Sequence, residues 1–489
     1  MEKQLKYVLL LSLKEMALRR VAVILWSDSD ILASISKFRT SWFSNEESEK
    51  EWREIIEHNV KDKMLKLELP KSLTKQMIDI VRRIGLQIRR WKECQEDYLR
   101  NDGEAIILPN SAKLCWTTAG TIDYRKTAEE LVRCDMLDLV QRYKLACINC
   151  LEDYIPLLWE ELPEEMKVIY GNDKYLCADL SFCWPHILKG EHFKLNSLLR
   201  TWDRIPLSFN QYAFETSVED GNKSATEYFF QKLTHEEREA SVMRTVVAVI
   251  RNIFRTRSLY LCRFRCQKLS EILCYLLSLM TPDQQMEIFK EHSSGILLRF
   301  LDWPWPDLYL ANTGLIWTFL PPSGYGDLLR KMADRFEMLD HYCPILFQEF
   351  FIRSPLDLKK CFVDQKSEFG FAPACRFLAI FFRSEDSESI EVIFRNVDAA
   401  DKVKLVFHPG VLELFYDFML MDKWHMVEVC LREATLSKED RGRLKGVFMV
   451  FLQRKNRGQI EWGNRNLKRL FEFLEDTDAL ADKEKKFQT

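Results

Sequence analysis

Helix-capping residues recur along the C-terminal half of this chain, each one ending an apolar run and opening a new helical pattern. The intervals between successive starts are 31 to 47 residues, about the length of one helix-pair unit in a repeat protein. Such a unit cannot bury its apolar face alone and must stack on its neighbours. The spacing therefore predicts a stacked array of helices. The six starts are Thr234, Thr281, Ser323, Ser354, Asp398 and Ser437.

The residues that follow these starts are typical of helix N-termini. Thr234-His-Glu-Glu237 and Thr281-Pro-Asp-Gln284 fit the capping box, in which the third helical side chain bonds back to the cap. Ser354-Pro355 repeats the proline of Thr281-Pro282, and Ser437 is followed by two acids that favour the helix dipole. An alternative stays open, because an ordinary all-helical protein also has capped helices at short intervals and alternate ones look periodic.

The composition is that of a soluble globular chain with a large core, since 47% of its 489 residues are hydrophobic and 30% are charged. The 16 glycines and 15 prolines are too few for the many turns of an all-β protein. We therefore expect an all-α fold, an α-solenoid of helix pairs that is ankyrin-like or HEAT-like and degenerate, with an irregular helical N-terminal region.

Four regions are expected along the chain. A loop is predicted at Asn210–Ser224, near the boundary between the second and third regions, because this segment is polar and has few apolar anchors. The regions are an irregular helical part (1–110), a first helical-repeat group with longer connections (111–226), an array of roughly 40-residue units (227–475) and a charged tail (476–489).

Charge and cysteine usage indicate the compartment and exclude some partners. A net charge of −3 favours neither a dedicated nucleic-acid binder nor a polybasic membrane clamp. The 14 cysteines are scattered, so most are expected to be buried thiols in a reducing compartment. The apolar run Tyr7–Leu13 resembles part of a signal peptide, but Lys14 and Glu15 interrupt it, and an amphipathic helix fits better. The expected location is cytoplasmic.

Cys147 and Cys150 form a CxxC pair with three possible explanations. They could be half of a zinc site completed by Cys177, Cys183 and His186, or a redox dithiol. They could also be two core residues, because thiols three apart share one helix face and their segment is apolar. We favour the core explanation, for this pair and equally for the pair Cys262/Cys266.

No catalytic motif is present in the sequence. GxSxG, a Walker loop, a dinucleotide fingerprint and HExxH are all missing, and the 8 histidines are dispersed. We therefore predict no enzyme, no metal and no cofactor. An enzyme whose residues assemble from distant parts of the chain stays as a lesser alternative.

One basic stretch is a candidate for binding an anionic partner or nucleic acid. Its six positive residues are interleaved with Phe254, Tyr260 and Phe264, and arginines among aromatic residues suit phosphates and stacked bases. The alternative is a solvated basic face whose acidic partners come from the next helix. The six residues are Arg251, Arg255, Arg257, Arg263, Arg265 and Lys268.

Trp303-Pro-Trp305-Pro-Asp307 is a compact apolar segment. It could line an exposed ligand groove or form a rigid corner between helices. We favour the packed corner, because the tryptophans bury a large area and the prolines disfavour helix.

Two segments resemble a large uncharacterised family of arachnid proteins. They are Cys115–Ala128 (CWTTAGTIDYRKTA) and Arg142–Trp159 (RYKLACINCLEDYIPLLW), and the resemblance is clearest over residues 110–170. Members of that family look like degenerate ankyrin-like helical-repeat proteins without assigned catalytic or binding residues. The resemblance implies a helical repeat and a scaffold role only by analogy of fold.

The expected function is a non-enzymatic scaffold that binds another protein along the concave face of the helical array. The alternative is binding of nucleic acid or another anionic partner through residues 251–268. No membrane contact is expected, and the sequence names neither the partner nor the face.

Overall fold

The computed structural model describes residues 4–38, 46–99, 114–173, 179–203, 207–251, 268–337, 342–364, 373–455 and 465–475. Every regular element in these ranges is a helix, so the predicted all-α class is confirmed. In the same ranges no helix is both long and apolar enough to cross a membrane. The chain forms two compact units, Met1–Leu308 and Tyr309–Thr489, which we describe one at a time.

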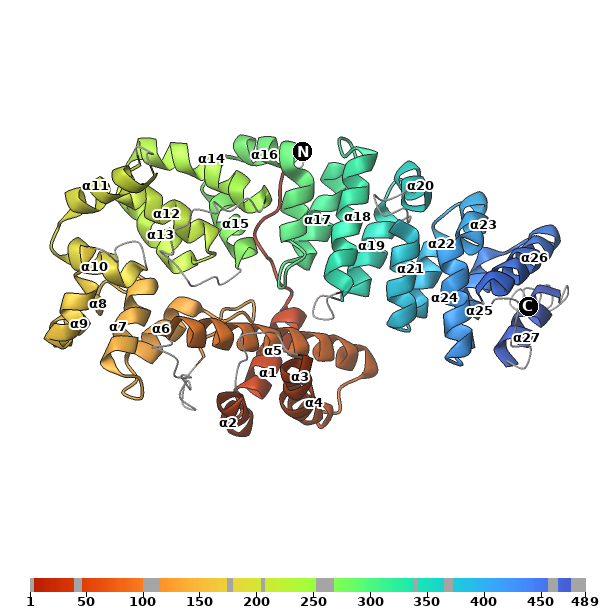
Figure 1. Ribbon diagram of the computed structural model, residues 1–489, viewed down its shortest axis with the longest axis horizontal. Helices are drawn as coiled ribbons and strands as arrows, with labels where there is room; N and C mark the ends of the chain where they lie inside the picture. The colour runs from red at the N-terminus through yellow and green to blue at the C-terminus, as the bar shows by residue number, and fades with distance from the viewer. Residues whose placement is uncertain are drawn as a thin grey trace. The chain divides into compact units, whose positions relative to one another are not determined.

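The N-terminal unit contains the helices up to α16, and the boundary between the units falls within α17 (Pro306–Ile316) (Figure 1). Its helices are α1 (Leu13–Trp26), α2 (Ser29–Lys37), α3 (Glu46–Glu51), the π-helical turn η1 (Trp52–Glu57), α4 (His58–Leu65), α5 (Lys71–Leu99), α6 (Tyr124–Val132), α7 (Leu139–Ile148), α8 (Ile155–Glu161), α9 (Glu164–Tyr170), α10 (Leu180–Leu188), α11 (His192–Asp203), α12 (Phe209–Glu219), α13 (Lys223–Lys232), α14 (His235–Arg251), α15 (Leu269–Ser278) and α16 (Pro282–Arg299).

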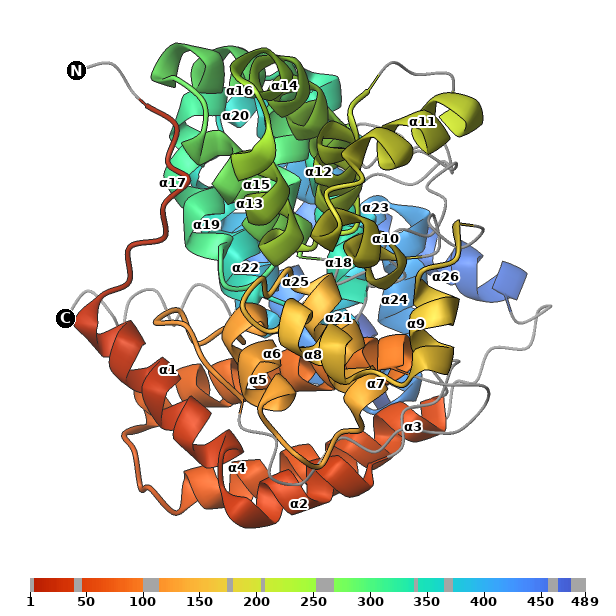
Figure 2. The same cartoon turned by 90° about the vertical axis from the view of Figure 1, so that its left-hand side faces the viewer.

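The first helix of this unit begins later than the apolar run at Tyr7 suggests. Residues 4–12 are extended, and α1 starts at Leu13 behind a capping box made by Ser12 and Glu15 (Figure 2). The buried face of α1 packs on α5, where the Trp26 indole N–H donates to the carbonyl of Val81 at 2.8 Å. The apolar residues of α5 that recur every three to four positions are buried, as expected for a 3.6-residue period; they are Met77, Val81, Ile84, Ile88 and Trp91.

The loop predicted at Asn210–Ser224 is wrong, because α12 and the start of α13 occupy this segment. The polar residues of α12 are buried and satisfied inside the unit, so low hydrophobicity did not mean exposure. Gln211 donates to the Ser241 hydroxyl, which in turn donates to the Glu215 carboxylate, each at 2.9 Å. Arg244 of α14 pairs with the same carboxylate.

The C-terminal unit is built on a regular packing order. Each helix from α18 to α24 packs on the helix three places further along, so that α18, α21, α24 and α27 form one row, α19, α22 and α25 a second, and α20, α23 and α26 a third (Figure 1). The helices are α18 (Pro322–Glu337), α19 (Pro344–Arg353), α20 (Leu356–Asp364), α21 (Pro373–Arg383), α22 (Ser387–Arg395), α23 (Ala399–Phe407), α24 (Pro409–Leu420), α25 (Trp424–Ala434), α26 (Lys438–Lys455) and α27 (Arg465–Glu475).

Polar side-chain bonds in this unit repeat the same order. Arg376–Glu337, Arg395–Glu433 and Lys404–Asp364 each join neighbouring helices of one row, across 38 to 40 residues of sequence. Lys423 and Glu385 join two inter-helix turns across 38 residues. These turns have the same geometry, since Glu385 and Asp422 both adopt a left-handed conformation with φ of 52° and 59°.

A cluster of phenylalanines fills the core between α19, α20 and α21. The rings of Phe347 and Phe377 are stacked with their centroids 4.4 Å apart, and both side chains are fully buried. Phe351, Phe362 and Phe381 complete the cluster. This cluster accounts for part of the high phenylalanine content, because large aromatic side chains contribute most of the buried area where short helices meet.

Four of the six predicted helix starts are confirmed by hydrogen bonds from the first turn to the cap. Thr281 and Thr234 accept from Gln284 N and Glu237 N, and both capping boxes are complete. Asp398 accepts from Asp401 N, and Ser437 from Asp440 N.

At the other two predicted starts a helix does begin, α18 at Pro322 and α20 at Leu356, but the predicted residue is not its cap. Ser323 lies inside the first turn of α18, which begins at Pro322. Ser354 ends α19 instead, and its buried hydroxyl donates to the Phe350 carbonyl and contacts the hydroxyl of Tyr325. The helix-pair unit also fails in this region, because three helices, α23 to α25, lie between Asp398 and Ser437.

Candidate functional site: a charged pocket in the N-terminal unit

A tight turn precedes α6 and forms one wall of the site. Trp116 and Ile122 form an isolated antiparallel bridge, and the Thr117 N–H donates to the Thr121 carbonyl at 2.8 Å. Gly120 closes the turn with φ of 73°, a conformation that glycine adopts without strain. The turn is fixed from outside by Arg19, whose guanidinium donates to the Ala119 carbonyl and lies over the Trp303 ring.

The Arg19–Trp303 contact also bears on the tryptophan–proline segment. Trp303 is partly buried against Arg19, and Pro306 is the first residue of α17. The segment connects α16 and α17, as expected for a corner, but both tryptophans are only partly buried, and one of its two prolines begins a helix instead of preventing one.

Three helices begin around a pocket of about 290 Å³ behind the turn. α6 starts after the cap Asp123, α13 after the cap Asn222, and α15 after Lys268. The Asn222 side chain serves two helices, because it accepts from Ala225 N and donates to the Ile148 carbonyl at the end of α7 at 2.8 Å. The pocket is thus lined by segments far apart in the sequence.

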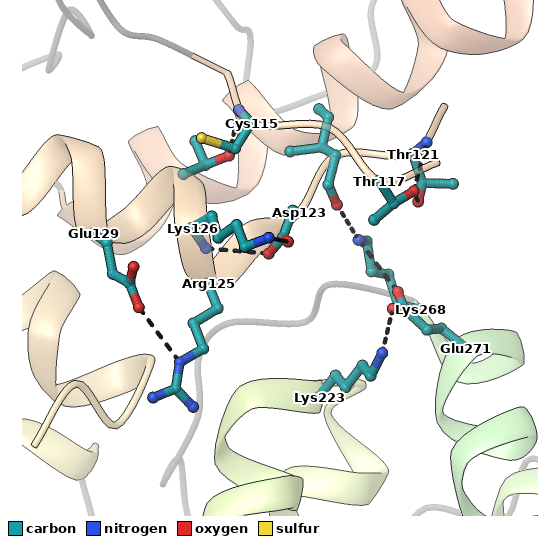
Figure 3. A network of polar contacts seen from close by, with 12 residues as sticks. Cys115, Thr117, Thr121, Asp123, Arg125, Lys126, Glu129, Lys223, Lys268 and Glu271 are labelled. Carbon is teal, nitrogen blue, oxygen red and sulfur yellow. Dashed lines mark hydrogen bonds and ion pairs between the residues drawn. The ribbon is translucent and has the colours of Figure 1, made fainter. Parts of the chain in front are cut away.

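The inner wall of the pocket is a shared ion pair. Lys223 and Lys268 approach the carboxylate of Glu271 from different elements, at 3.0 and 3.4 Å (Figure 3). Lys268 also donates to the Ile122 carbonyl at 2.9 Å and lies 3.7 Å from the centroid of the Tyr124 ring. These contacts tie α13 and α15 to the turn.

The outer wall carries looser pairs. Arg125 lies 3.5 Å from Glu129, and Lys126 lies 3.7 Å from Asp123, all within the first turns of α6 (Figure 3). Glu227 of α13 faces the same space at 3.8 Å from Lys223. Four cations and four carboxylates therefore surround one pocket.

The carboxylates of the pocket differ in acidity. Burial acts to raise the pKa of Glu271, but the charges of Lys268 and Lys223 outweigh it and hold this pKa below its ordinary value. Burial raises the pKa of Glu227, and the positive charges of Lys223 and Arg125 do not offset it. Glu271 is thus held as an anion in the wall, whereas the charged form of Glu227 is less stabilised.

The basic stretch predicted as a binding site is only partly within the described residues. Lys268 lies in the pocket, while Arg251 lies at the end of α14, 3.7 Å from Glu291 and beside His292. The structure does not place these two residues around a common site. Arg255, Arg257, Arg263 and Arg265 lie outside the described residues, so their role stays a prediction.

Sequence analysis missed the other cations of the pocket. A local signal was present, because Arg125 and Lys126 stand in the first turn of α6 and Lys223 is the first residue of α13. The helix dipole disfavours cations at an N-terminus. Residues that oppose a local rule are expected to mark functional or strained places.

The CxxC pair consists of buried thiols, as the core explanation predicts, but the two do not share a helix face, because α7 ends at Ile148 and Cys150 lies beyond it with φ of 51°. Cys147 and Cys150 are at most 1% exposed, and burial raises the pKa of both thiols well above the ordinary value. A reactive thiol needs the opposite shift. No group of three or more potential ligands placed to hold a metal occurs in the described part of the chain. Cys177, Cys262 and Cys266 lie outside it.

Comparison with known proteins gives no identification. No protein-family model matches the chain, and no curated protein matches it either. The resemblance to the arachnid family therefore stays a prediction.

Proposed function

We propose that this protein is a non-enzymatic interaction scaffold whose C-terminal unit is a helical-repeat array of three-helix units. The observation that carries the proposal is a packing order. Each helix from α18 to α24 packs on the helix three places further along, and ion pairs join these helices across 38 to 40 residues. Repeat units of about 40 residues with two or three helices are typical of HEAT and armadillo arrays. Arrays of this kind commonly present extended surfaces to other proteins.

The apolar side chains that this unit exposes suggest where a partner binds. Ile345 and Ile352 lie seven residues apart on one face of α19 and are 57% and 47% exposed. Leu356 at the start of α20 is equally exposed. Several exposed apolar side chains on neighbouring turns favour a protein interface over a solvated face. We therefore assign partner binding to the exposed face of α19.

A binding role fits the pocket of the N-terminal unit better than catalysis. Its lining contains eight charged side chains but neither histidine nor cysteine. Charged side chains that pair with one another suit the binding of a charged group.

The test is affinity purification of the tagged full-length protein from its native cell extract, at low and at moderate salt. The double substitution Ile345→Glu/Ile352→Glu is expected to remove a discrete protein partner that the wild type retains at moderate salt. The matched control is Val447→Glu/Val450→Glu on α26, where two valines are exposed to a similar degree. A partner retained by the α19 variant would contradict the proposal, as would a wild type that purifies alone under both conditions.

A further inference from the structure

The pocket of the N-terminal unit is lined by eight charged side chains. Its four cations all stand at the beginnings of helices, where the helix dipole already attracts anions. They are Arg125, Lys126, Lys223 and Lys268, and the four carboxylates that face them belong to Asp123, Glu129, Glu227 and Glu271. The number of positive groups equals the number of negative groups.

The inner charges act as a rigid base. Lys223 and Lys268 both pair with the Glu271 carboxylate. Lys268 also contacts the Ile122 carbonyl and the Tyr124 ring. Their side chains have little remaining freedom, so a ligand above them meets a preorganised surface.

Two outer groups retain bonding capacity toward the pocket. The Arg125 guanidinium has five donors, and Glu129 at 3.5 Å is the ion-pair partner that the structure gives it. Glu227 is bonded only loosely, by Lys223 at 3.8 Å. Arg125 and Glu227 come from α6 and α13 and are close enough to influence each other electrostatically. One can take an oxyanion while the other takes a donor.

We propose that this pocket binds a small zwitterionic molecule, with its anionic group on Arg125 and its ammonium group on Glu227. A simple anion would meet four carboxylates and a simple cation would meet four cations, whereas a ligand of both signs complements the alternation. Guanidinium groups bind phosphate and carboxylate in the same bidentate manner. The volume of about 290 Å³ is at the lower end of ligand pockets and fits a small molecule.

The first experiment is isothermal titration of the full-length protein with four probes. O-phosphoethanolamine and γ-aminobutyrate carry both charges and differ in the anionic group, while inorganic phosphate and ethanolamine carry one charge each. At least one zwitterion is expected to bind ten times more tightly than either single-charge probe. Phosphate alone binding as tightly as both zwitterions would overturn the proposal, and so would the absence of binding by all four probes.

The second experiment locates the ligand. Arg125→Gln and Glu227→Gln leave the Lys223–Glu271–Lys268 contacts in place, and each is expected to weaken binding of the zwitterion at least tenfold. Arg443→Gln and Glu413→Gln, two exposed ion-pair residues of the C-terminal unit, are the matched controls and keep the wild-type affinity. Circular dichroism melts verify that all four variants fold. Wild-type affinity in both pocket variants would show that the molecule binds elsewhere and would overturn the proposal. Failure here is independent of the scaffold function, which the α19 variant tests.

Discussion

The two units of this protein are both made of short helices, but they are held together over different sequence distances. In the C-terminal unit the side-chain bonds between helices mostly span 38 to 42 residues, as Arg395 to Glu433 does across 38. In the N-terminal unit, Lys268 reaches Ile122 across 146 residues and Arg19 reaches Ala119 across 100. In the first pattern each helix is stabilised by helices that are near it in the sequence. In the second, the contacts join segments that are far apart in the sequence.

This difference explains why the pocket lies where it does. In the C-terminal unit each helix from α18 to α24 packs on the helix three places further along, so the contacts between helices are similar throughout the unit. Long-range closure instead brings dissimilar segments together, as at Asn222, where the cap of α13 bonds the end of α7. Polar groups from distant segments therefore converge through long-range contacts, and not through a packing order that is the same along the unit.

The largest expected effect is on the core of the C-terminal unit. Phe377→Ala removes a fully buried ring from the phenylalanine cluster and is expected to cost about 3–5 kcal/mol of stability. Because the helices of this unit are stabilised by helices near them in the sequence, the effect should stay within the unit. Amide hydrogen exchange measured by mass spectrometry should accelerate in α18–α25 and stay unchanged in α6–α13. Equal acceleration in both units would show that they unfold as one and would remove the comparison.

A smaller effect separates a helix cap that also makes a long-range bond from a purely local one. Asn222→Ala removes the cap of α13 and leaves the buried Ile148 carbonyl without its donor, so it is expected to cost about 2–3 kcal/mol. Asp398→Ala, which removes the cap of α23, is the matched control and should cost about 1 kcal/mol. Urea unfolding of each variant measures the free energies. Equal losses would mean that the bond across α7 and α13 adds nothing.

The smallest expected effect depends on pH. Glu271→Gln leaves Lys223 and Lys268 without their shared anion, and we expect a loss of about 1–2 kcal/mol at pH 7. The pKa of Glu271 lies below its ordinary value in the folded protein. Its contribution is therefore complete above the unfolded-state pKa, near 4.5, and is lost as the pH falls through the lower folded-state value.

Urea unfolding of wild type and Glu271→Gln at pH 7, 5 and 3.5 checks this dependence. The difference in free energy should be the same at pH 7 and 5 and smaller at pH 3.5. Glu337→Gln is the control in the C-terminal unit, since the exposed Arg376 pair also lowers the pKa of Glu337 but is more solvated. A difference that is unchanged at pH 3.5 would show that packing, and not charge, makes Glu271 important.

The sequence predicted the helices well where the signal was local. The capping boxes of Thr234 and Thr281 needed only residues within one turn, and both are present. Ser354 failed because serine before proline is read as a cap, whereas Tyr325 and the Phe350 carbonyl engage its hydroxyl at the end of α19. The α12 segment failed because the partner that satisfies Gln211 lies 30 residues away.

By itself, then, the sequence determined the all-α class, the confirmed helix starts and the buried nature of Cys147 and Cys150. These follow from apolar period and capping, which act over a few residues. The tertiary structure alone decided that helices pack in threes, that Lys268 joins Lys223 at Glu271, and that Arg125 faces the same pocket. Each of these depends on which distant surfaces meet. That choice is made by the packing of whole helices. The cations in the first turns of α6 and α13 are a local signal of the place, but no local pattern shows which segments they meet.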